Sequence, residues 1–192
     1  DHPVVIQFTH GVHGSEPSSY DAIMPLLYFL AAGQGAEVAD MLDRSVIHLI
    51  GPINPDGTER FASWTNMHRA RVPVADPQHR EHYHEWPWGR TNHYWFDLNR
   101  QWLPVTQPEA VALVQATREW MPNIAADFHE MGTNSTYFFS PGPPDGLHPL
   151  LSTDGLALNQ RMNSFLNEQL DGEGALYVSE ELFDDFYLGY GS

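Results

Sequence analysis

Short apolar runs alternate with longer helical stretches along this chain, and this alternation limits its fold more than any other feature of the sequence. The apolar runs have the length of strands and span residues 3–9, 45–50 and 123–129. The stretches of helical character span residues 17–32, 36–42, 108–120 and 156–170. Strands that alternate with helices form largely parallel sheets that helices cover on both faces. We therefore predict an α/β fold with a mixed, largely parallel sheet.

Two segments between these elements differ from them in composition. Asn54-Pro55-Asp56-Gly57 follows the second apolar run and has the composition of a tight turn. Residues 63–94 are rich in His, Pro, Trp and Arg without a sustained period, which predicts a long ordered loop. Long ordered loops often carry function.

The length of 192 residues is enough for one hydrophobic core, and we expect a single domain over residues 1–192. The chain begins two residues before its first apolar run, and residues 190–192 carry no signal for a helix end. We therefore expect a domain that is incomplete at both ends.

No apolar run approaches the roughly 20 residues of a membrane span, and residues 1–3 do not resemble a signal peptide. These observations predict a soluble chain without a membrane partner, and they leave its compartment and oligomeric state open.

The charge and the cysteine content exclude two classes of site. Nine Lys and Arg residues stand against 25 Asp and Glu residues, which gives a formal net charge of −16. Such a chain repels phosphate backbones, so we expect no nucleic-acid partner. The sequence has no cysteine, and any protein-bound metal must therefore be held by His, Asp or Glu.

Histidines follow two of the apolar runs, where parallel sheets collect their ligands. In His13-Gly14-Ser15-Glu16 an imidazole and a carboxylate lie three residues apart and can face one point. His10 is a competing candidate, but the residue three positions later is a histidine and not a carboxylate. His129 ends the third run. Taken singly, these residues are more typical of a surface turn and of a buried histidine than of a metal site.

Four motifs together, in this order, resemble those of the zinc carboxypeptidases related to carboxypeptidase A. The motifs are His13-Gly14-Ser15-Glu16, Asn54-Pro55-Asp56-Gly57, Asp97-Leu98-Asn99-Arg100 and Asp127-Phe128-His129. The resemblance extends from residue 4 to at least residue 132. It implies a zinc carboxypeptidase-like fold and a hydrolase that cleaves the C-terminal peptide bond of a peptide, or a related amide.

The resemblance also implies roles for single residues. His13, Glu16 and His129 would bind one zinc ion, with Asp97 orienting His13. Zinc would lower the pKa of water and polarise the carbonyl of the substrate.

The same resemblance implies a substrate anchor and an electrophile. Asn99 and Arg100 would hold the terminal carboxylate, for which the planar fork of arginine is well suited, although Arg100 alone would suggest a surface salt bridge. Arg90 would polarise the scissile carbonyl, because it precedes the third motif at the spacing seen in many members of the family. Arg69 and Arg71 remain alternatives for that task.

One part of the family pattern is not found. The family places a general-base glutamate on a late strand, shortly after a lid tyrosine, and we expect that glutamate beyond Ser192. Other carboxylates and tyrosines lack the family's context, and these are Glu130, Glu180, Glu181, Tyr187 and Tyr190. Two other functions therefore stay open: a deacylase of N-acyl amino acids of the aspartoacylase and succinylglutamate desuccinylase type, and a non-catalytic zinc- or peptide-binding module. The motif at residues 54–57 favours the peptidase over the deacylase.

Overall fold

The computed structural model describes residues 2–132, 135–138 and 149–178, which form two compact units. The first unit comprises the described residues up to Glu130, and the second begins at Met131. Each unit is described by itself, and the single domain expected over residues 1–192 stays a prediction.

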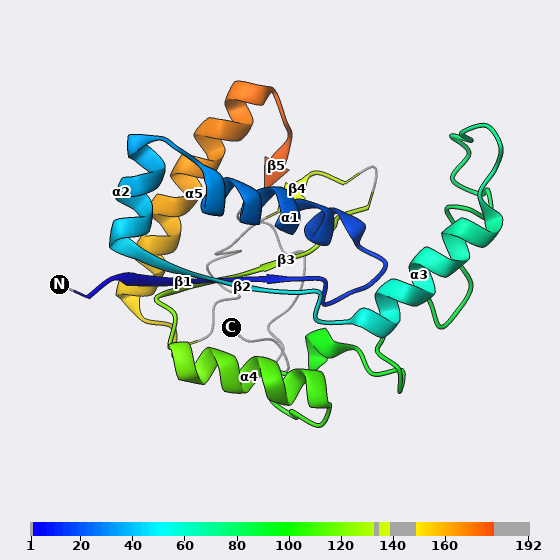
Figure 1. Cartoon of the computed structure of the whole chain (residues 1–192), viewed down its shortest axis with the longest axis horizontal. Coiled ribbons are helices and arrows are strands. Elements are labelled where there is room, and N and C mark those ends of the chain that lie inside the picture. The colour runs from blue at the N-terminus through cyan, green and yellow to red at the C-terminus, as the bar shows by residue number, and fades with distance from the viewer. Residues whose placement is uncertain (1, 133–134, 139–148, 179–192) are drawn as a thin grey trace. The chain divides into compact units, whose positions relative to one another are not determined.

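A parallel sheet forms the centre of the first unit. Its strands are β1 (Val4–His10), β2 (Ser45–Ile50) and β3 (Ile124–Phe128), in the order β2-β1-β3. Each strand ends within one residue of the predicted run, and the prediction of a largely parallel sheet is confirmed. β2 is half-buried along its whole length rather than buried. Because all three strands run the same way, their carboxyl ends meet at one edge (Figure 1).

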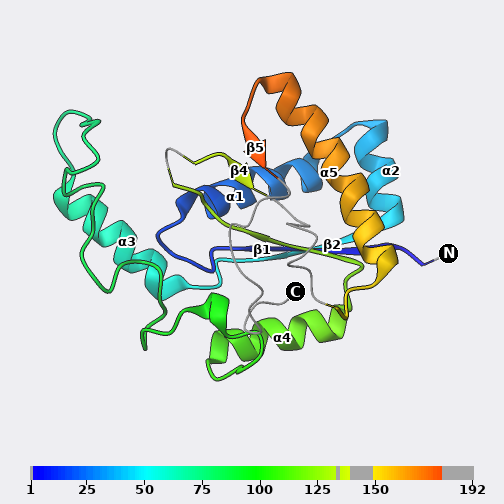
Figure 2. The ribbon, with the colours of Figure 1, turned by 180° about the vertical axis from the view of Figure 1, so that it is seen from behind.

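Helices cover both faces of this sheet. The helices α1 (Pro17–Ala32) and α2 (Ala36–Arg44) join β1 to β2 and lie on one face, whereas α4 (Pro108–Trp120) precedes β3 and lies on the other (Figures 1 and 2). Pro17 and Pro108 occupy the first turns of their helices, where a missing N–H leaves no hydrogen bond unmade. The predicted α/β fold is confirmed.

A small apolar cluster lies beneath the loops at the carboxyl edge of the sheet. Its fully buried members are Val12, Ile53, Leu98 and Leu113. Burial of each such side chain contributes roughly 1.5–3 kcal/mol to folding. The cluster therefore anchors the loops that carry the sequence motifs.

The predicted turn at residues 54–57 is wrong, because a helix begins there. Helix α3 spans Pro55–His68, so the first part of the predicted loop 63–94 is helical as well. The Asn54 Oδ1 accepts a hydrogen bond from the Gly57 N–H at 2.9 Å and caps the helix. Asparagine followed by proline suits a turn and a helix start alike, and the capping bond decides between them.

The second unit contains α5 (Thr153–Glu173) and the two-residue strands β4 (Tyr137–Phe138) and β5 (Tyr177–Val178), which pair in parallel. The predicted helix 156–170 is confirmed and is three residues longer at each end. The Ser152 hydroxyl oxygen caps its start by accepting from the Gly155 N–H at 2.9 Å.

No single helix among the described residues has the length and apolar composition needed to cross a membrane. The helices α1 and α2 reach that composition only when taken together, and they are bent by 97°.

Candidate metal centre

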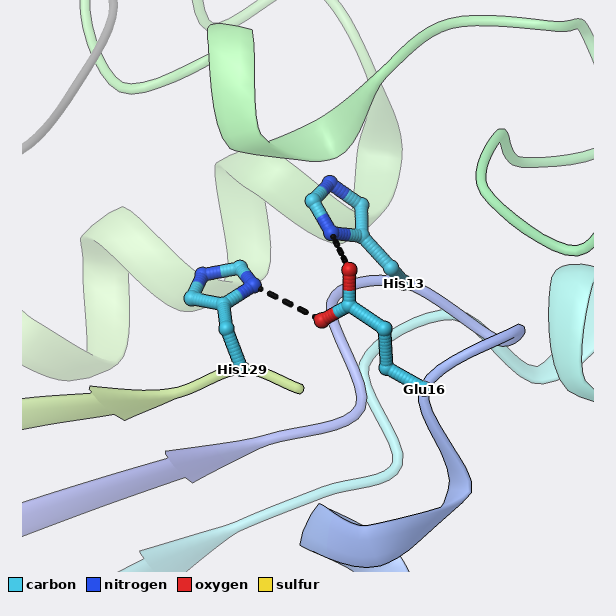
Figure 3. A group of neighbouring side chains, drawn as sticks. All are labelled: His13, Glu16 and His129. Carbon is cyan, nitrogen blue, oxygen red and sulfur yellow. Dashed lines mark hydrogen bonds and ion pairs between the residues drawn. The ribbon is translucent and has the colours of Figure 1, made fainter. Parts of the chain in front are cut away.

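The carboxyl edge of the sheet brings His13, Glu16 and His129 together. His13 lies in the loop that leaves β1, Glu16 is the residue before the first turn of α1, and His129 directly follows β3 (Figure 3). The Glu16 N–H donates to the carbonyl of His13 at 3.2 Å, which folds the loop back on itself. Residues from two distant parts of the sequence thus face one point.

The Glu16 carboxylate lies between the two imidazoles. His13 Nδ1 is 2.7 Å from Oε1, and His129 Nδ1 is 3.0 Å from Oε2 (Figure 3). The side chains of His13, Glu16 and His129 are 3%, 17% and 30% exposed. One donor atom from each residue lies within 4.8 Å of the others.

The second ring nitrogen of each imidazole, Nε2, lies within hydrogen-bond distance of a further carboxylate. His13 Nε2 is 3.0 Å from Asp97 Oδ1, and His129 Nε2 is 2.9 Å from Asp127 Oδ2. A carboxylate accepts a hydrogen bond from an N–H at Nε2, which leaves the lone pair of a neutral imidazole on Nδ1. In the neutral state that metal binding requires, the lone pairs of both rings would therefore point toward Glu16.

The surrounding charges shift the pKa values of the group. Burial alone would lower the pKa of His129, but hydrogen bonds and charges from Asp127 and Glu16 raise it to about 10. Burial would raise the pKa of Glu16, and its bonds to His129 and His13 instead lower it to about 2. The pKa of His13 is raised by Asp97 and Glu16 against the effect of burial. Three carboxylates around two imidazoles thus favour positive charge at this point.

The donor set fits zinc. Two imidazoles and one carboxylate are a ligand set of catalytic zinc sites, in which a fourth position stays open. The acceptors at both Nε2 atoms supply the supporting hydrogen bonds that such ligands need.

Three glycines allow the loops of this site to pack closely against one another. A methyl group on Gly14 would lie 2.0 Å from the Gly57 carbonyl carbon, one on Gly57 would lie 2.3 Å from the Gly89 carbonyl oxygen, and one on Gly89 would lie 2.7 Å from the Ser15 nitrogen. Each contact is too close for a real side chain. The loop of His13, the start of α3 and the loop of Arg90 therefore pack backbone against backbone.

Asp97 links Arg90 to the metal centre. Arg90 Nε donates to Asp97 Oδ2 at 2.9 Å, while Oδ1 of the same carboxylate faces His13. Burial would raise the pKa of Asp97, but its bond to His13 and the charge of Arg90 lower it to about 2. The Arg90 side chain is 38% exposed, and within the described residues its Nη atoms have no hydrogen-bond partner. The fully buried Asn54 fixes the backbone here by donating to the Arg90 carbonyl at 3.1 Å.

Asn99 lies beside the centre, on the short 3₁₀ helix η1 (Leu98–Arg100). Its Nδ2 is 3.2 Å from His129 Nε2, and its N–H donates to Asp97 Oδ1 at 2.9 Å. Arg100 Nη1 donates to the Asn99 carbonyl at 3.0 Å. The structure thus joins His13, Glu16, His129, Asp97, Arg90 and Asn99 in one network, and it places Arg100 next to Asn99.

The alternative arginines lie elsewhere. Arg69 and Arg71 are exposed beyond the end of α3, which leads away from the sheet (Figure 1). In the part of the chain that the structure describes, no hydrogen bond or ion pair joins either of them to the metal centre. The Glu130 carboxylate accepts from the N–H and hydroxyl of Ser18 at 3.0 and 2.6 Å, at the start of α1, and the Glu130 backbone N–H donates to Glu16 Oε2 at 3.1 Å. Glu180, Glu181, Tyr187 and Tyr190 lie outside the described residues.

Two residues, one bonded to His129 and one in the loop between Arg90 and Asp97, were not given a role from the sequence. Asp127 precedes His129 by two positions, and alternation along a strand puts both on one side, which is a signal that the sequence did contain. Asn92 is fully buried and shapes the turn between Arg90 and Asp97. Its Oδ1 accepts from the N–H groups of Tyr94 and Phe96 at 3.1 and 3.0 Å. No spacing in the sequence marks such a contact.

Comparisons with known proteins place this chain among proteins of one kind. A family model described as zinc carboxypeptidase matches residues 3–148. Carboxypeptidase D of Mus musculus is 26% identical over 132 residues, which is 64% of this chain and 8% of that protein. A probable carboxypeptidase 2 of Trichophyton verrucosum is 27% identical over 173 residues, which is 90% of this chain and 26% of that protein.

A solved structure also shares the fold. The crystal structure of a metallo-carboxypeptidase from Burkholderia cenocepacia superposes with a TM-score of 0.63 at 16% identity, over 97% of this chain and 42% of that chain. The chain thus spans only part of the length of every one of these proteins.

Proposed function

This chain belongs to the zinc carboxypeptidase family, and from that premise we propose that it binds one zinc ion through His13, Glu16 and His129 and acts in the hydrolysis of a C-terminal peptide bond. The observation that carries the proposal is the convergence of both Nδ1 atoms on the Glu16 carboxylate. Zinc in such a site supplies Lewis acidity and lowers the pKa of water.

The protein's own side chains would divide the remaining work. Asp97 and Asp127 hold protons at the two Nε2 atoms, and so keep both Nδ1 lone pairs directed inward. Arg90 is held by its Nε, and its accessible Nη atoms would donate to the carbonyl oxygen as negative charge develops there.

Asn99 and Arg100 would recognise the terminal carboxylate of the peptide. One Nε2 atom cannot donate to Asp127 and also accept from the Asn99 amide. When His129 donates to Asp127, the Asn99 amide N–H groups are therefore available to a substrate oxygen. Arg100, the next residue, would add a guanidinium that matches a carboxylate with two hydrogen bonds.

The metal content of the purified protein tests the assignment. We expect about one zinc ion per chain by elemental analysis. The His129→Ala variant should lose most of it, whereas His93→Ala, which removes a histidine side chain that is 68% exposed, should retain it. A folded protein without zinc, or equal zinc in both variants, would show that the assignment is wrong.

The substrate class is tested separately on the zinc-loaded, full-length protein. A carboxypeptidase cleaves peptides with a free terminal carboxylate and spares N-acyl amino acids without a peptide bond. Preference for N-acyl amino acids would instead identify a deacylase, and zinc binding without turnover of either class would identify a binding module. The family match favours the peptidase.

A further inference from the structure

His10 is buried next to the metal centre but belongs to no part of the mechanism above. It is the last residue of β1 and is 2% exposed. Its Nδ1 is 2.8 Å from the backbone carbonyl of Ser19. A carbonyl oxygen only accepts hydrogen bonds, so Nδ1 carries the proton of this ring. Within the described residues His10 Nε2 has no partner.

The hydrogen bond of His10 joins it to helix α1, which begins directly after Glu16. Ser19 lies in the first turn of α1 and is itself buried, at 5% exposed. Its hydroxyl oxygen accepts from the N–H of Gly11 at 3.1 Å. The end of β1 is therefore tied to the start of α1 twice, once by a side chain and once by the backbone.

The face of the His10 ring contacts the strand that carries His129. His10 stacks on Phe128 with ring centroids 4.8 Å apart and planes inclined by 7°. Phe128 is the partner of His10 in the sheet register and directly precedes His129. One buried ring therefore contacts both elements that present zinc ligands, α1 and β3.

We propose that His10 is a positioning residue that sets the separation of Glu16 from His129, and thereby the affinity of the site for zinc. The inference rests on the proposed function. A phenylalanine would fill the same space and would avoid the unpaired buried Nε2, whose burial is unfavourable. The property that distinguishes the imidazole from an apolar ring here is its bond to α1, which fixes the helix start relative to β3.

Three substitutions of His10 separate its hydrogen bond to Ser19 from its stacking on Phe128. His10→Asn keeps a donor near the Nδ1 position and loses the stacked ring, His10→Phe keeps the ring and loses the donor, and His10→Ala loses both. Ser19→Ala is the matched control, because it removes the hydroxyl bond to Gly11 and keeps the carbonyl that His10 uses.

The dissociation constant for zinc, from competition with a chelator, is the primary measurement. Loss of a supporting contact around a metal typically weakens binding about 10–100-fold. We expect a loss in this range for His10→Ala, smaller losses for His10→Asn and His10→Phe, and little change for Ser19→Ala. The absorption spectrum of the cobalt-substituted protein should shift in the His10 variants, because it reports the arrangement of the ligands.

The thermal unfolding midpoint of the metal-free variants distinguishes positioning from general stability. A lowered midpoint with an unchanged zinc affinity and cobalt spectrum would overturn the inference while leaving the proposed function intact. Absence of zinc binding by the wild-type protein would overturn the proposed function, and the inference with it.

Discussion

His13 and His129 turn the same ring nitrogen, Nδ1, toward the two oxygens of the Glu16 carboxylate, and their rings lie 4.9 Å apart. The Nε2 atom of each ring lies beside an aspartate of its own, although His13 is 3% exposed and His129 is 30% exposed. This pairing makes the roles of Asp97 and Asp127 directly comparable.

The first prediction concerns Asp127, which accepts from His129 Nε2. Asp127→Ala should weaken zinc binding about 10–100-fold, because the His129 ring loses the acceptor that fixes its orientation and tautomer. The measurement is the zinc dissociation constant. Asp76→Asn, at an exposed aspartate that bonds only within its own turn, should leave the constant unchanged. Equal constants for wild type and Asp127→Ala would contradict the role given to this carboxylate.

The second prediction concerns recognition of the substrate by Arg100. In the full-length, zinc-loaded protein, Arg100→Ala should lower kcat/KM for peptides with a free terminal carboxylate by a factor equivalent to roughly 2–5 kcal/mol, the loss expected when a buried charge pair is broken. Peptides with an amidated terminus should be cleaved about as slowly by the variant as by the wild type. An equal loss for both peptide classes would mean that Arg100 has a structural role.

The third prediction concerns the packing of the three glycines. Gly14→Ala places a methyl group 2.0 Å from the backbone of Gly57, so the loop must move away from α3. We expect a loss of at least about 1–3 kcal/mol in the free energy of unfolding, as for overpacked cores, together with weaker zinc binding. In α5, Gly172→Ala meets no atom within 4 Å and should stabilise the protein by up to about 1 kcal/mol. A Gly14→Ala protein as stable as the wild type would contradict the close packing.

The fourth prediction concerns the pH dependence that His10 contributes. Burial lowers the pKa of His10 from 6.5, against the opposing effects of its bond to Ser19 and the charge of Asp127. The unfolded chain therefore binds a proton more readily than the folded one, and this contribution to stability is present above pH 6.5 and falls below it. The decrease is at most about 1.4 kcal/mol per pH unit.

The check compares the metal-free wild type with His10→Asn, which has no titrating group at this position. As the pH falls from about 7.5 to about 5.5, the unfolding free energy of the wild type should decrease more than that of the variant. A difference that stays constant over this range would contradict the lowered pKa.

Local sequence patterns were sufficient to predict the strands of the sheet and most of the helices. The strands β1, β2 and β3 were predicted from apolar runs to within one residue at each end, because each strand is a short run of mostly apolar residues. Helix α3 was missed because its capping residues, Asn54 and Pro55, are also turn residues. Only the hydrogen bond from Gly57 to Asn54 distinguishes the two structures.

The grouping of His13, Glu16 and His129 could be predicted because their motifs follow strands and, together with two other motifs, resemble those of a known family. The geometry adds contacts that no spacing reveals, such as the ring of His10 against Phe128 and the burial of Asn92. Both depend on residues that fold together from distant positions.

X-ray absorption at the zinc edge of the zinc-loaded protein tests the central claim most directly. The ligand set of His13, Glu16 and His129 predicts two imidazoles, with oxygen in the remaining positions, at about 2.0–2.2 Å. No sulfur should appear, since the chain contains no cysteine. In a His129→Ala protein loaded with excess zinc, any site that remains should show one imidazole. The same number of imidazoles in both proteins, or more than two in the wild type, would contradict the ligand assignment.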